Sequence, residues 1–168
     1  MRLTAAIAFF GTLPALAGPI PYTVPSSSGL KVVEDNVDFP YVAFTGVLRI
    51  RANYFVDCST VCPSVTLRLS DEEAKNVPYF LKDEEALLPS NIQLKNDYEA
   101  ALALVGEDRI KQLEDGRVAR LAGEIEISLG NYFATYECDG PVYVGTFVSV
   151  DRVVVSPAET SEEISDTC

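Results

Sequence analysis

Hydrophobic and polar residues alternate along several stretches of the chain, as is typical of β-strands with one buried face. In residues 41–54 every even position is apolar or glycine, whereas Arg49 and Arg51 stand at odd positions. Residues 65–69 repeat this alternation over a shorter length. We therefore expect a long half-buried strand over residues 41–54 and a second strand that pairs back on it.

The C-terminal half of the chain shows the same period. Residues 121–129 carry Leu, Ile or Gly at every odd position, and residues 142–150 carry Val or Thr at every even position. Between these two strands, residues 130–131 (Gly-Asn) and 139–141 (Asp-Gly-Pro) are typical of tight turns. Residues 152–155 contain three consecutive valines, and we expect this run to be covered on both faces.

A helical period separates the two strand-rich halves. We predict a helix over residues 97–114, bent or broken at Gly106, because apolar residues recur there at helical spacing: Tyr98, Ala101, Leu102, Val105, Ile110 and Leu113. Capping-box spacing indicates two helix starts, at Ser70 with Glu73 and at Asn96 with Glu99. Residues 71–96 are long for one loop, so we expect them to contain short elements of their own.

Gly46 and Gly123 both lie inside strand patterns. A glycine weakens a strand unless a bulge, a bend or a close backbone approach requires it, so both are predicted to mark where strands coil around a small barrel. This order of strands, with a helix before the second glycine-bearing strand, resembles the oligonucleotide/oligosaccharide-binding (OB) fold over residues 41–155. It is also similar to small exported bacterial proteins of this shape whose role is unassigned.

The predicted fold class is therefore mainly β with one helix, as a small five-stranded OB-like barrel. A two-sheet β-sandwich is the structural alternative, because both folds present strands with one buried face. Since fold does not carry function with it, the resemblance leaves the activity open.

The first seventeen residues, MRLTAAIAFFGTLPALA, have the composition of a signal peptide. Arg2 supplies the positive start, an apolar stretch follows, and residues 15–17 form the small-x-small pattern that a signal peptidase cuts, so the mature chain is predicted to begin at Gly18. Pro14 interrupts the apolar stretch well short of the roughly 20 residues that cross a bilayer. We therefore expect no membrane span and a periplasmic or secreted protein.

The rest of the chain divides into three parts by composition. Residues 18–29 are rich in Pro and Ser and are predicted to be a flexible leader. Residues 30–155 contain the periodic segments and are predicted to form a single β-rich domain. Residues 156–168 are polar and acidic, which is typical of a solvated C-terminal tail.

The formal net charge of −12 restricts the classes of partner. An acidic surface repels phosphate backbones, so nucleic acid is excluded as the expected partner, and a basic protein or a cell-envelope component is favoured instead. The chain contains no histidine, which excludes His-based catalysis and His-based zinc sites. The acidic clusters 71–73 and 83–85 lack the residue spacing of an EF-hand, so no metal site and no cofactor are predicted.

Four cysteines lie in the predicted mature chain, and an even number in an oxidising compartment indicates disulfides: Cys58, Cys62, Cys138 and Cys168. Three pairings are possible on paper, and we favour Cys58 with Cys62 and Cys138 with Cys168. Three residues separate Cys58 from Cys62, whereas the thioredoxin-like motif has two and begins a helix, so a redox centre is not expected.

The candidate ligand-binding residues are aromatic: Tyr132, Tyr136, Tyr143 and Phe147, with Phe133 in the same group. If alternate members face outward, they form a platform for sugar rings, peptide or another protein, and core packing is the favoured role for at least half of them. No catalytic residue is predicted.

We therefore expect an exported, non-enzymatic binding domain for a protein or cell-envelope ligand. The alternatives are a small His-independent enzyme that uses carboxylate or Cys chemistry, and a structural envelope protein. The oligomeric state is not indicated by the sequence.

Overall fold

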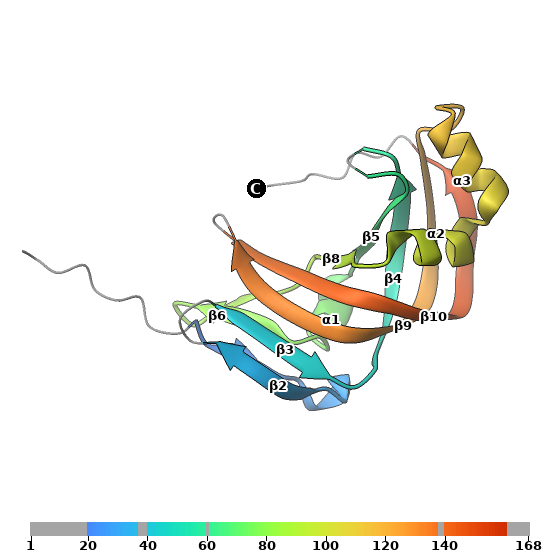
Figure 1. The fold of residues 1–168 in the computed structure, drawn as a ribbon. Coiled ribbons are helices and arrows are strands. Elements are labelled where there is room, and N and C mark those ends of the chain that lie inside the picture. The colour runs from blue at the N-terminus through green and yellow to red at the C-terminus, as the bar shows by residue number, and fades with distance from the viewer. Residues whose placement is uncertain (1–19, 37–39, 60, 138–139, 161–168) are drawn as a thin grey trace, which may run out of the picture.

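The computed structural model describes residues 20–36, 40–59, 61–137 and 140–160, and its architecture is mainly β (Figure 1). Five strands form a closed barrel: β4 (Leu48–Asp57), β5 (Ser64–Arg68), β8 (Asn91–Leu94), β9 (Arg120–Glu137) and β10 (Gly140–Glu159). The strands pair in the ring order β4, β5, β8, β10, β9, and only the β8–β10 pairing is parallel. The predicted OB-like barrel is thus confirmed.

The barrel interior contains the apolar positions that the alternation predicts. In β4 the even residues are buried and Arg49, Arg51 and Asn53 are exposed, while Val65 and Leu67 of β5 point inward. The other strands supply further buried residues: Ile92, Leu94, Leu121, Ile125, Ile127 and Leu129. Burying one face of each strand leaves the other face outside the barrel, available for polar groups.

The two strand glycines have the roles predicted for them. Gly123 of β9 lies directly opposite Tyr54 of β4, and a Cβ atom at Gly123 would lie 2.6 Å from the Tyr54 hydroxyl oxygen. Gly46 has a φ of 117°, and it separates β3 (Tyr41–Thr45) from β4, so the stretch predicted as one strand is two strands with a bend between them. Gly46 therefore lets the chain turn, and Gly123 leaves room for the Tyr54 ring beside its own backbone.

Three helices lie between the barrel strands. Helix α1 (Asp71–Ala74) begins at Ser70, whose hydroxyl accepts a hydrogen bond from the Glu73 N–H at 3.2 Å, as predicted. Helices α2 (Asp97–Val105) and α3 (Glu107–Glu114) meet at Gly106, which has a φ of 79°. The predicted helix over residues 97–114 is therefore present and broken at Gly106.

Asn96 does not cap α2 as the capping-box spacing predicts. Its amide nitrogen donates to the Phe147 carbonyl at 3.1 Å, and its amide oxygen accepts from the Phe147 N–H at 2.7 Å. The side chain thereby imitates a strand backbone and continues the parallel contact of β8 with β10. The capping prediction is wrong because closing the barrel uses both polar atoms of this amide.

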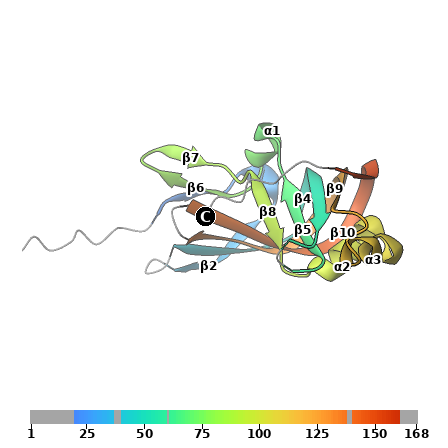
Figure 2. The same cartoon turned by 90° about the horizontal axis from the view of Figure 1, so that it is seen from above.

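Strands β9 and β10 extend beyond the barrel, and the extended part lies beside β3, as Figure 1 shows. There β3 pairs with β9, and β2 (Lys31–Asn36) pairs with β3. A second sheet contains β1 (Tyr22–Thr23), β6 (Tyr79–Lys82) and β7 (Glu85–Leu87), and Figure 2 shows β6 and β7 on the opposite side of the molecule from β2. These short elements lie within the segment 71–96 as predicted, except β1.

The ends of the described chain differ from the predicted leader and tail. Within residues 18–29, Tyr22–Thr23 form β1 and Ser26–Ser28 form a short 3-10 helix, because both segments find partners in the folded domain. At the other end β10 continues to Glu159, and the Thr160 N–H donates to the Arg120 carbonyl at 3.2 Å. Regular structure therefore extends into both segments that composition alone separates from the domain.

Two local predictions on β9 and β10 are wrong. Residues 130–131 form no tight turn: Asn131 has a φ of 45° inside a continuous β9, at a shift in the β9–β10 register. The run 152–155 is not covered, since Val153 and Val155 are 54% and 50% exposed. Asn131 lies where β9 has passed beyond its pairing with β4, and Val153 and Val155 lie where β10 has passed beyond its pairing with β8, so these residues are outside the core.

Candidate functional site

Three adjacent barrel strands, β4, β5 and β8, present a continuous polar outer face. Because their inward-pointing neighbours are buried, the alternation places the polar residues outside. The strand register aligns Asn53 of β4 with Arg68 of β5, and Arg68 with Asn91 of β8. A second row joins Phe55, Thr66 and Gln93.

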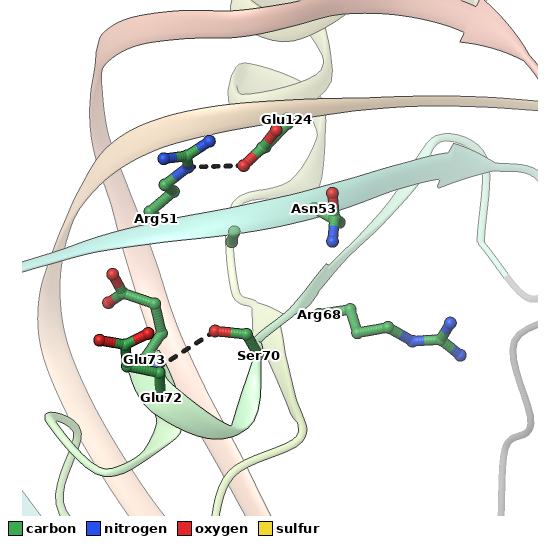
Figure 3. A pocket seen from close by; sticks show the side chains of 8 residues that line it. Arg51, Asn53, Arg68, Ser70, Glu72, Glu73 and Glu124 are labelled. Atoms are coloured by element: carbon green, nitrogen blue, oxygen red, sulfur yellow. Dashed lines mark hydrogen bonds and ion pairs between the residues drawn. The ribbon is translucent and has the colours of Figure 1, made fainter.

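A hollow of about 380 Å³ opens on this face where α1 meets the sheet (Figure 3). Its lining comes from four elements and the residue before α1: Arg51, Ala52, Asn53, Arg68, Ser70, Glu72, Glu73 and Glu124. The volume lies within the range of about 300–1,000 Å³ that is usual for ligand sites. Every lining residue except Ala52 has a polar side chain, so the hollow is suited to a hydrogen-bonding ligand.

Charges of both signs meet in the hollow. The Arg51 Nε atom lies 2.5 Å from a Glu124 carboxylate oxygen, and this hydrogen bond and charge raise the pKa of the Arg51 guanidinium. Glu72 and Glu73 lie on α1 across from this pair, as Figure 3 shows. Hydrogen-bond donors and acceptors therefore lie side by side. A purely negative ligand would be repelled by the carboxylates of the lining, and a purely positive ligand would be repelled by its arginines.

Two arginines line the hollow, and the side chain of Arg68 extends away from Glu72 and Glu73 (Figure 3). Its guanidinium carbon lies 5.4 Å from the centroid of the Phe55 ring, which is a cation–π geometry. The Phe55 ring is 4% exposed, so the arginine stem covers it. This contact holds the guanidinium on the outer face at the centre of the Asn53–Arg68–Asn91 row.

The Asn91 side chain lies at the end of this row. Its amide oxygen is the one buried side-chain oxygen or nitrogen, among the residues that the structure describes, without a hydrogen-bond partner in the protein. A buried acceptor in that state costs free energy.

The β4–β5 connection beside this face is fixed at its start. Asp57 is buried, and its Oδ2 atom accepts from Arg120 Nε at 2.9 Å, while Oδ1 accepts from the Ser59 N–H and hydroxyl at 3.1 and 2.8 Å. The Cys58–Cys62 disulfide closes the connection, as predicted. The other predicted pair, Cys138 with Cys168, lies outside the described residues.

The predicted aromatic residues lie away from the hollow, where the second sheet packs on β9 and β10. Tyr132 and Tyr143 are buried and their rings stack with centroids 6.5 Å apart. The Tyr132 hydroxyl donates to the Pro78 carbonyl at 2.9 Å, and burial raises its pKa well above the ordinary value. Because both rings belong to the core, they cannot form an exposed platform.

Tyr143 holds the second sheet through its hydroxyl, which donates to the Leu87 carbonyl and accepts from the Phe80 N–H at 3.3 Å. Burial raises the pKa of Tyr143 to about 12. Tyr136 and Phe147 are half-buried and pack against the core, so a ligand contact at these two residues stays a prediction. Core packing, the favoured role, thus accounts for Tyr132 and Tyr143.

Over residues 20–36, 40–59, 61–137 and 140–160, no three Cys, Asp or Glu side chains come together as a metal site. Within the same ranges no helix is long and apolar enough to cross a bilayer.

Sequence reasoning missed the residues of the hollow. The alternation placed Arg49 and Arg51 on the outer face of their strand, but it could not show that Arg68, Ser70 and Glu124 lie beside Arg51. That information is in the register between strands, which depends on the whole fold. Comparison with known protein families, with curated proteins and with solved structures finds no match.

Proposed function

We propose that this chain is an exported, non-enzymatic binding protein that holds a neutral oligosaccharide of the cell envelope on the outer face of β4, β5 and β8. The observation that carries the proposal is the mixed polar lining of the hollow, in which Arg51 and Arg68 share one surface with Glu72, Glu73 and Glu124. The polar row Asn53–Arg68–Asn91 extends this surface along the sheet.

The charges of the lining favour a neutral ligand over a charged one. A phosphate backbone would meet three carboxylates, and a basic peptide would meet two guanidinium groups. Sugar hydroxyls both donate and accept hydrogen bonds, so they match carboxylates, guanidinium groups and amides at once. The shallow, strand-built surface also agrees with the way OB folds bind oligomers.

Export is part of the proposal and rests on residues 1–17. A signal peptidase that cuts after Ala17 would release a chain beginning at Gly18. An oxidising compartment would then keep the Cys58–Cys62 disulfide closed beside the binding face.

The test is calorimetric titration of the purified protein with short neutral oligosaccharides, acidic oligosaccharides and basic peptides. We expect binding to a neutral oligosaccharide, and we expect Arg68→Met to weaken it about ten- to hundredfold, since a hydrogen bond to a charged group contributes about 1.5–3 kcal/mol. Methionine keeps an unbranched stem over Phe55 and removes only the guanidinium.

Arg117→Met is the matched control, because Arg117 is an exposed arginine paired with Asp115 and lies outside the hollow. It should bind as the unaltered protein does. Equal weakening by both substitutions, or binding of basic peptides alone, would contradict the proposal.

A further inference from the structure

Strand β2 is the outermost strand of its sheet, and all six of its residues are exposed. One edge of the strand pairs with β3. On the other edge, residues 31–35 make no backbone hydrogen bond to any further strand within the described part of the chain. Such an edge presents a row of N–H and C=O groups that can pair with another strand.

The side chains of β2 combine an exposed apolar pair with charged residues of both signs. Val32 and Val33 are adjacent and are 40% and 62% exposed, and the strand contains no proline. Strand β10 gives a comparison. Its pairing with β9 has five register shifts, and it contains Pro157; both features deter pairing with a further strand. Strand β2 has one register shift, between Val32 and Glu34.

We propose that β2 pairs antiparallel with β2 of a second copy of this chain, about a two-fold axis. In one register Lys31 lies opposite Glu34 of the second copy, because the bulge at Val33 puts Lys31 and Glu34 on the same face of the strand. The two-fold axis repeats this contact, so two Lys–Glu pairs flank one central contact between the bulged valines, Val32 and Val33, of the two copies. The strand is therefore complementary to itself in charge and in hydrophobicity.

The size of the contact sets the expected affinity. Opposite-charge pairs and apolar pairs across strands each contribute only a small stabilisation. A single strand pair buries less than the roughly 1,200 Å² of a standard stable interface, so we expect a dissociation constant in the micromolar range or weaker. The net charge of −12 on each chain opposes association, so measurements belong near physiological ionic strength, where repulsion is screened.

A charge-swap experiment tests this pairing by sedimentation equilibrium up to about 1 mM protein, which covers weak dimers. Lys31→Glu places two glutamates opposite each other at both ends of the contact, and Glu34→Lys places two lysines there. Each single variant should be monomeric where the unaltered protein is dimeric. A mixture of the two single variants should recover the dimer, because each then meets the opposite charge.

The matched control is the same exchange at Lys82 and Glu85, an exposed cross-strand pair of the β6–β7 hairpin. Neither control variant should change the dimer. Hydrogen exchange should show protection of the β2 amides in the dimer and loss of that protection in Glu34→Lys. A monomer at every concentration, or single β2 variants that dimerise normally, would overturn the proposal, as would protection of β2 only when a foreign peptide is added.

Discussion

The contact between Gly123 and Tyr54 gives the sharpest prediction about the barrel. The two residues are directly opposite on β9 and β4, and the Tyr54 side chain is 1% exposed. A Cβ atom at Gly123 would lie 2.6 Å from the Tyr54 hydroxyl oxygen and 2.7 Å from two ring carbons. Non-bonded carbon atoms normally approach to about 3.5–4.0 Å, so Gly123→Ala forces the ring to move by about 1 Å.

The buried ring has little room for that movement. Overpacking of a close-packed core costs about 1–3 kcal/mol, and we expect Gly123→Ala to lower the free energy of unfolding by about 3 kcal/mol. With an m-value near 2 kcal/mol/M, the urea midpoint should fall by about 1.5 M. Gly140→Ala is the control, since a Cβ atom there meets nothing within 4 Å, and it should stay within about 0.5 kcal/mol.

A double variant separates the clash from other effects of alanine. Tyr54→Leu removes the ring atoms that the new Cβ would meet, so Tyr54→Leu with Gly123→Ala should cost less than the two single changes summed. We expect a coupling of about 1–3 kcal/mol. Additive costs, or a Gly123→Ala midpoint equal to that of Gly140→Ala, would refute the assigned contact.

The remaining predictions concern barrel closure, pH and export. Asn96→Ala should lower the unfolding free energy by about 1–3 kcal/mol in a urea titration, because both bonds to Phe147 are lost, and no change would contradict this closure. Burial raises the pKa of Asp97 to about 6 from 3.8, so stability should fall as pH rises from 4 to 6. Asp97→Asn keeps an acceptor for the Val65 N–H, so its stability should fall less with pH in this window than that of the unaltered protein, and it should be about 1–2 kcal/mol more stable at pH 7 after allowance for solvent contact. An unchanged pH profile would refute the assignment. Intact mass of the exported chain should correspond to a start at Gly18, and retention of residues 1–17 would oppose cleavage.

The barrel could be predicted because each strand carries its own inside and outside in its alternation. The need for a close approach at Gly123 could be predicted for a similar reason, since a glycine in a strand requires a nearby cause, but the approaching group, the Tyr54 ring on another strand, could not. The break at Gly106 follows from the same local logic. These features depend on residues close in sequence or on one strand face.

The binding face and the closure of the barrel depend on contacts between distant residues. Asn96 has capping-box spacing, yet it bonds Phe147, because the fold brings β10 beside the end of β8. Alternation shows which side of a strand is polar, but the neighbour of Arg68 across the sheet is set by register. Core packing of part of the aromatic set could be expected from the sequence, but which rings are buried could not, because β9 and β10 pack under a second sheet that has only a weak sequence pattern.

Residue-level mapping of ligand binding tests the central claim most directly. Titration of isotope-labelled protein with a short neutral oligosaccharide should shift the amide resonances of β4, β5 and β8 around Asn53 and Arg68, and in Arg68→Met the same shifts should require about ten- to hundredfold more ligand. Resonance changes confined to the aromatic region around Tyr136 and Phe147, or no changes with any oligosaccharide, would contradict the account.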